Sequence, residues 1–85
     1  PEHIELIAET GIIDQIIDWF GSDIRIAKTD EESKVRVGVK ASPNAMVHWA
    51  MQYIDYVEIV SPESLRSRLK EALENGLKKY TSESE

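Results

Sequence analysis

The pattern of apolar residues along the chain predicts an α+β domain, a ferredoxin-like βαββαβ plait with an additional C-terminal helix. Two observations carry this prediction. Residues 34–40 alternate strictly between apolar and other positions, which is typical of a half-buried strand. Two Ser-Pro pairs, Ser42-Pro43 and Ser61-Pro62, have the residue types that open helices. With right-handed crossovers, the order strand, helix, strand, strand, helix, strand places both connecting helices on one face of the sheet.

The first part of the chain contains two predicted strands with a helix between them. Residues 4–8 are apolar apart from one glutamate and include two β-branched isoleucines, and they predict a strand. Thr10 is expected to cap the helix, and Gly21 is the residue type that ends one. Residues 23–28 alternate again and predict a half-buried strand. Its inward residues are expected to be Ile24 and Ile26.

The second part of the chain contains the strand over residues 34–40, a helix, a further strand and a longer final helix. A helix over residues 43–53 leads to a strand over residues 56–60. The final helix, over residues 62–80, is about 28 Å long at 1.5 Å per residue. Because a domain of this size is itself about 30 Å across, two alternatives stay open: its apolar stripe is covered by its own domain, or it docks on another chain. The stripe consists of Leu65, Leu69, Leu73, Leu77 and Tyr80.

Length and charge limit the functions that the chain can have. Its 85 residues make a single domain, residues 1–85, and its 41% hydrophobic and 31% charged residues are typical of a globular chain. The net charge of -6 argues against binding nucleic acid or an anionic membrane through the overall field. Since there is no cysteine, a thiolate nucleophile or a Cys-based zinc site is excluded. The chain begins at Pro1 without an initiator Met, so we expect a piece of a longer protein.

No group of residues predicts catalysis, a cofactor or a metal site. His3 and His48 fall on different predicted elements without partners at ligand spacing, so we interpret both as surface residues. Asp14 and Asp18 lie one helical turn apart beside an apolar stripe. We interpret both as solvated residues on the surface of the helix. The four glycines form no phosphate loop, and no serine lies in a nucleophile elbow. We therefore expect neither an enzyme nor a cofactor.

The open sheet face and a few exposed apolar positions are the remaining candidates for function. The outward strand positions carry no aromatic residue, which excludes RNA recognition by base stacking; the face is then either solvated surface or a contact with a partner domain. Phe20 and Trp49 fit core stripes, whereas Trp19 falls beside its stripe. The outward residues are Glu5, Arg25, Arg36, Gly38 and Glu58. The candidate interface residues are Trp19, Arg25, Arg36, Leu73, Leu77 and Tyr80.

Several segments in order resemble the C-terminal extension, the WCX domain, of WYL-domain transcriptional regulators. Residues 16–21 (Ile-Ile-Asp-Trp-Phe-Gly) resemble the family's (I/V)-I-D-x-F-G, with Trp19 where many relatives have a basic residue. A Val-Arg-Val-Gly-Val strand and a helix with a central tryptophan follow. Residues 56–66 (Tyr-Val-Glu-Ile-Val-Ser-Pro-Glu-Ser-Leu-Arg) are similar to v-x-I-x-x-P-e-x-l-r. The resemblance covers about residues 5–80.

The resemblance implies a bacterial cytoplasmic regulator of the DeoR-like, helix-turn-helix kind. Such proteins have an N-terminal winged helix-turn-helix and a middle WYL domain of Sm-like fold, neither of which is present here. It implies that DNA is bound only through that absent N-terminal domain. The partners would be other domains of the same regulator and further copies of it, as a homo-oligomer, with no membrane contact. The extension is associated with dimer contacts and with coupling the sensor to the DNA-binding domain.

Two hypotheses from different classes follow. The first is a non-enzymatic regulatory domain that mediates oligomerisation or signal coupling. The alternative is an ACT-like domain that senses a small molecule, since ACT domains share the plait and bind amino acids near the first strand–helix loop, here Glu9-Thr10-Gly11.

Overall fold

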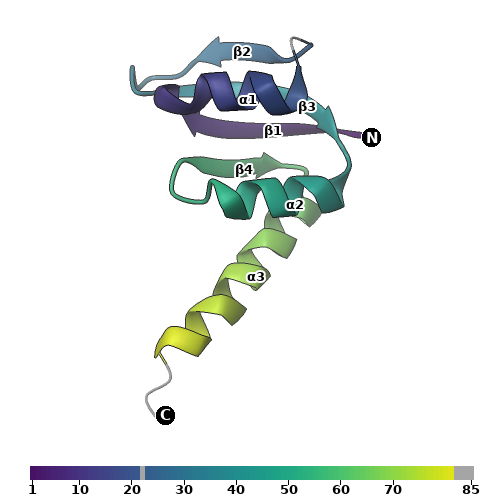
Figure 1. Ribbon diagram of the computed structural model, residues 1–85, viewed down its shortest axis with the longest axis vertical. Coiled ribbons are helices and arrows are strands. Elements are labelled where there is room, and N and C mark those ends of the chain that lie inside the picture. Colours follow the sequence, from purple (N-terminus) through teal and green to yellow (C-terminus); the bar gives the residue numbers. More distant parts are fainter. Residues whose placement is uncertain (22, 82–85) are drawn as a thin grey trace.

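The computed structural model describes residues 1–21 and 23–81, which form one four-stranded sheet and three α-helices (Figure 1). Short connections join most of the elements, and a single 3-10 turn precedes the first helix. In chain order the elements are β1 (Glu2–Glu9), the 3-10 turn η1 (Thr10–Ile12), α1 (Ile13–Phe20), β2 (Arg25–Lys28), β3 (Lys34–Ala41), α2 (Pro43–Gln52), β4 (Val57–Ser61) and α3 (Glu63–Thr81).

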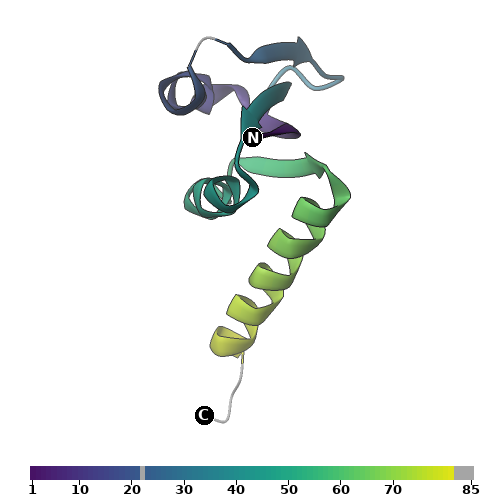
Figure 2. The same cartoon turned by 90° about the vertical axis from the view of Figure 1, so that its right-hand side faces the viewer.

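The sheet has the strand order β2-β3-β1-β4, and every neighbouring pair is antiparallel. The two long strands β1 and β3 pair at its centre, from Glu2 opposite Ala41 to Glu9 opposite Lys34. Figure 2 shows α1 and α2 on the same side of the sheet, with α3 leaving beyond β4. The other face is open in the described part of the chain. The α+β class, the antiparallel sheet and the helices therefore agree with the sequence prediction.

One core lies between the sheet and the two helices α1 and α2. The alternation of β1 and β3 sends their apolar residues inward, where they meet Trp49 of α2. The Trp49 ring packs edge-on against Phe20 of α1, with 5.1 Å between ring centroids, and lies 4.9 Å from the Tyr53 ring. The buried residues are Ile4, Leu6, Ala8, Ile12, Ile16, Val35, Val37, Val39, Met46, Trp49, Ala50, Val57, Ile59, Leu65 and Leu69.

The helix boundaries follow the expected signals at two of four places. At Ser61-Pro62, Ser61 ends β4, and the Pro62 carbonyl accepts the first hydrogen bonds of α3, which begins at Glu63. The Ser42 hydroxyl accepts a hydrogen bond from the Ala45 backbone N–H at 3.1 Å and so caps α2, with Pro43 in the first turn. Gly21 ends α1 with a positive φ of 79°, and its N–H donates to the Ile17 carbonyl. Thr10 was expected to cap the first helix, and that prediction is wrong. Its N–H donates to the Ser33 carbonyl at 2.9 Å, and it begins the 3-10 turn instead.

The second strand differs from its prediction in burial. All four residues of β2 are exposed, and Ile26 keeps 44% of its surface in solvent, so the expected half-buried strand is wrong. The physical reason is its position: β2 is an edge strand that pairs only with β3. Ile24, which precedes the strand, is the inward residue that packs against the core.

Candidate functional site

The C-terminal half of α3 projects away from the domain that anchors its first two turns (Figure 1). Leu65 and Leu69 are buried against the core. Further along the same stripe, the exposed fraction rises to 39% at Leu73, 61% at Leu77 and 87% at Tyr80. These last three residues, the projecting stripe, lie on one helical face. The structure thus excludes the first alternative for this helix, because its own domain covers only the first half of the stripe, whereas docking on another chain stays a prediction.

A groove runs between β4 and α3 beside the projecting stripe. Its volume is about 600 Å³. Arg66 fixes α3 against β4 on one side of it, since its Nη1 donates to the Ile59 carbonyl at 2.7 Å and to the Glu58 carboxylate at 2.9 Å. The groove is lined by the apolar residues Ile54, Val57, Ile59, Leu69, Leu73 and Leu77 and by the polar residues Glu58, Glu63, Arg66, Ser67, Lys70 and Glu74.

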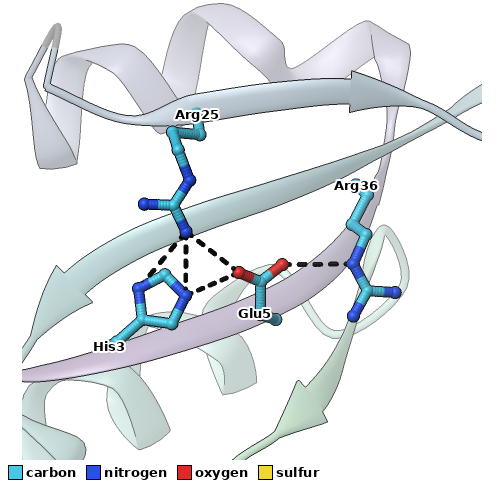
Figure 3. A network of polar contacts seen from close by, with 4 residues as sticks. All are labelled: His3, Glu5, Arg25 and Arg36. Carbon is cyan, nitrogen blue, oxygen red and sulfur yellow. Dashed lines mark hydrogen bonds and ion pairs between the residues drawn. The ribbon is translucent and has the colours of Figure 1, made fainter.

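The open sheet face carries a polar network of four residues, the open-face network (Figure 3). Glu5 on β1 is its centre: Oε1 accepts from Arg36 Nε at 3.1 Å, and Oε2 accepts from Arg25 Nη2 at 3.2 Å. His3 Nε2 lies 2.6 Å from Glu5 Oε2 and 2.9 Å from Arg25 Nη2. His3 Nε2 cannot both donate a hydrogen bond to Glu5 and accept one from Arg25. The tautomer with a proton on Nε2 donates to Glu5, and the tautomer without that proton accepts from Arg25.

Strand register explains why these residues meet. Gly38 of β3 lies directly between Glu5 of β1 and Arg25 of β2. A Cβ at Gly38 would lie 2.8 Å from Arg25 Nη2 and 3.0 Å from Glu5 Oε2, so glycine leaves the space in which the two side chains meet. A shallow hollow of about 440 Å³ remains there. It is lined by Glu5, Arg25, Ile26, Ala27, Arg36 and Gly38.

The network sets the ionisation of Glu5. Partial burial alone would raise the pKa of the Glu5 carboxyl, because desolvation disfavours the charged form. The hydrogen bonds and positive charge from His3 and Arg36 outweigh burial, and the net pKa is lowered from its ordinary value of 4.5. Only 19% of the Glu5 side-chain surface is exposed to solvent, whereas both arginines are exposed. Glu5 is thus a carboxylate that holds two arginines in place.

The structure brings together some of the predicted interface residues and separates others. Arg25 and Arg36 share Glu5, and the three residues of the projecting stripe share one face of α3. Trp19 is 60% exposed on α1, which lies at the other end of the molecule from the projecting half of α3 (Figures 1 and 2). His3 and Arg66 are contact residues that the sequence pattern did not predict. No periodic signal identifies either residue, because their partners are set by strand register and by the turn into α3.

The residues that were considered for catalysis or metal binding lie on the surface and form no common site among the described residues. Asp14, Asp18 and His48 are exposed on α1 and α2. Among the described residues, no group of three His, Cys, Asp or Glu side chains is placed to hold a metal ion. The first strand–helix loop, Glu9 to Gly11, lines neither the groove nor the hollow. Within residues 1–21 and 23–81, every helix is too short or too polar to cross a membrane.

Comparison with known proteins gives one match. Neither the curated proteins nor the solved structures contain a match to the chain. The model of the WCX domain family matches residues 1–77, which cover most of the chain. This is the family whose motifs the sequence resembles, and its domains are regulatory domains associated with WYL-containing transcriptional regulators rather than a known family of enzymes. The chain therefore belongs to the WCX domain family.

Proposed function

We propose that the chain is a non-enzymatic regulatory domain of a bacterial transcriptional regulator, and that its projecting α3 joins two copies of that regulator. The observation that carries this proposal is the gradient of exposure along one stripe, from buried Leu65 and Leu69 to exposed Leu73, Leu77 and Tyr80. Three large side chains at helical spacing on a helix that leaves its domain are typical of a helix–helix contact.

A second copy of α3 in antiparallel orientation fits this surface. Lys70 and Glu74 flank the projecting stripe on the same side of the helix, so an antiparallel pair places Lys70 of one copy against Glu74 of the other. In that register the two-fold axis lies at residue 72, so that Leu73 of the two copies come close together beside it. Leu77 of each copy then reaches the groove between β4 and α3 of the other. The antiparallel arrangement also pairs the opposite ends of the two helix dipoles.

The remaining parts of this proposal concern the whole regulator. We place the chain, as a single domain, at the C-terminal end of a longer cytoplasmic protein whose winged helix-turn-helix holds the DNA. The family membership and the net charge of -6 support the assignment of DNA binding to another domain, since an acidic domain is a poor binder of duplex DNA. Coupling of the sensor domain to the DNA-binding domain is the second role proposed for it.

We also assign the chain to the ferredoxin-like plait with an additional C-terminal helix. The strand order β2-β3-β1-β4, the antiparallel pairing and the position of α1 and α2 on one side of the sheet support this assignment. The helix α3 is then the addition to the plait, which accords with its separate role as a contact helix.

Sedimentation equilibrium of the chain tests the oligomerisation proposal. We expect reversible dimers, and we expect the double variant Leu73→Glu/Leu77→Glu to be monomeric because two buried carboxylates oppose association. The matched control is Gln15→Glu/Asn44→Glu, which adds the same charge at exposed positions of α1 and α2 and should still dimerise. A chain that stays monomeric at every concentration, or a stripe variant that dimerises as the control does, contradicts the proposal.

A further inference from the structure

The open sheet face has a charge opposite to that of the chain as a whole. Four cations and three carboxylates occupy outward positions on the four strands, although the chain has a net charge of -6. The three carboxylates are Glu5, Glu9 and Glu58. The cations are Arg25, Lys34, Arg36 and Lys40. A local surplus of positive charge on an acidic chain favours an acidic partner at this face.

The two arginines at the centre of this face keep most of their hydrogen-bonding capacity. In the described residues, Arg36 bonds to Glu5 only through Nε, and Figure 3 shows its two terminal nitrogens pointing away from that carboxylate. Arg25 uses only Nη2. A guanidinium has five N–H donors in a planar fork, so each arginine has donors left for another group.

Glu5 also holds the two arginine side chains in fixed positions before a ligand binds. One carboxylate holds both guanidinium groups, and Gly38 leaves the space in which they approach. Side chains that are already held lose less conformational entropy when a ligand arrives. The half-buried Ile7 lies directly opposite Arg36 on the same face and adds apolar contact beside the charges.

We propose that the open sheet face is a docking surface for a protein surface that presents carboxylates, with Arg25 and Arg36 as its anchors. A carboxylate matches the planar fork of arginine in two-point hydrogen bonding. The hollow of about 440 Å³ over Gly38, between the two arginines, has room for a carboxylate side chain. This surface is separate from the projecting stripe of α3 and does not depend on dimerisation.

Nucleic acid is the other polyanion that arginines bind, and the structure disfavours it. The outward positions of the strands carry no Phe, Tyr or Trp on which a base would stack. Glu5 and Glu9 lie within the face, where a continuous run of phosphates would meet them. Carboxylates on flexible side chains can turn away from Glu5 and Glu9, whereas phosphates are fixed in the backbone that they form.

Titration of the chain with a hexaglutamate peptide, followed by amide chemical shifts, tests this inference. We expect shifts on β1, β2 and β3 that weaken with added salt. The variant Arg25→Gln/Arg36→Gln should bind at least about tenfold more weakly. The control Lys28→Gln/Arg68→Gln removes the same charge at exposed positions off this face and should bind within about twofold of the parent. Far-ultraviolet circular dichroism checks that both variants stay folded.

Three results would overturn the inference. The first is an absence of peptide-induced shifts on the open face. The second is an equal loss of affinity in the two double variants, since it would mean that only net charge matters. The third is tighter binding of hexathymidylate or of inorganic phosphate than of the peptide at the same amides, which would assign the face to phosphate. Peptide binding by Leu73→Glu/Leu77→Glu is expected to be unchanged, so failure of the α3 proposal is distinguished from failure of this one.

Discussion

Replacing Glu5 by Gln tests the open-face network through its pH dependence. The substitution keeps the shape of the side chain but removes the charge that holds Arg25 and Arg36. An exposed ion pair contributes about 0.2–1 kcal/mol, and solvent screens both arginines here. The two pairs together therefore give about 1 kcal/mol, and we expect Glu5→Gln to lower the free energy of unfolding by that amount at pH 7.

The sign of the pH effect follows from the lowered pKa of Glu5 in the folded chain. A carboxyl whose pKa is lower in the folded state than in the unfolded state stabilises the fold above its unfolded pKa, near 4.5. That stabilisation is lost as the pH falls through the folded pKa. Urea unfolding at pH 7 and at pH values below 4.5 should thus show a difference between parent and Glu5→Gln that shrinks with acid.

The control for this prediction is Glu71→Gln, which removes an exposed carboxylate of α3 away from the network. It should change the unfolding free energy little at either pH. Unfolding of Glu5→Gln at the same urea concentration as the parent at pH 7 would show that the ion pairs of Glu5 do not stabilise the fold. A difference between the two proteins that persists undiminished in acid would contradict the lowered pKa of Glu5.

Three further predictions follow from packing. Leu69→Ala should cost about 2–4 kcal/mol in urea unfolding because Leu69 is buried, whereas Leu77→Ala should cost under about 0.5 kcal/mol in dilute solution, where the chain is monomeric. Gly38→Ala should change stability by less than about 1 kcal/mol, because only the ends of the Arg25 and Glu5 side chains must move, but it should weaken hexaglutamate binding in the shift titration. Trp49→Ala should cost about 3–5 kcal/mol in the same unfolding assay, since its ring contacts Phe20 and Tyr53.

The elements with strong local signals were predictable from sequence. The alternation of residues 34–40 and the Ser42-Pro43 cap depend on neighbours in the chain, and both are confirmed as β3 and as the start of α2. Ile26 shows the limit of such signals. An alternating pattern gives the side on which a residue lies, but burial depends on whether the strand becomes an edge, which only the sheet order decides.

The candidate surfaces were predictable only in part, for a related reason. Arg25 and Arg36 were assigned to the outward face from alternation alone, and the structure places them there. Their shared contact with Glu5 and His3 depends on the register of three strands far apart in sequence. Likewise, the leucine stripe of α3 was visible in the sequence, but the point at which it leaves the domain depends on how β4 turns into the helix.

Cysteine cross-linking tests the antiparallel pairing of α3 most directly, because the native chain has no cysteine. We predict that Leu73→Cys, beside the two-fold axis, forms a covalent dimer under mild oxidation. Asn75→Cys, on the opposite side of the same helix, should remain monomeric in the same conditions. Equal cross-linking of the two variants, or none at Leu73→Cys, would contradict the claim that the projecting stripe joins two copies of the chain.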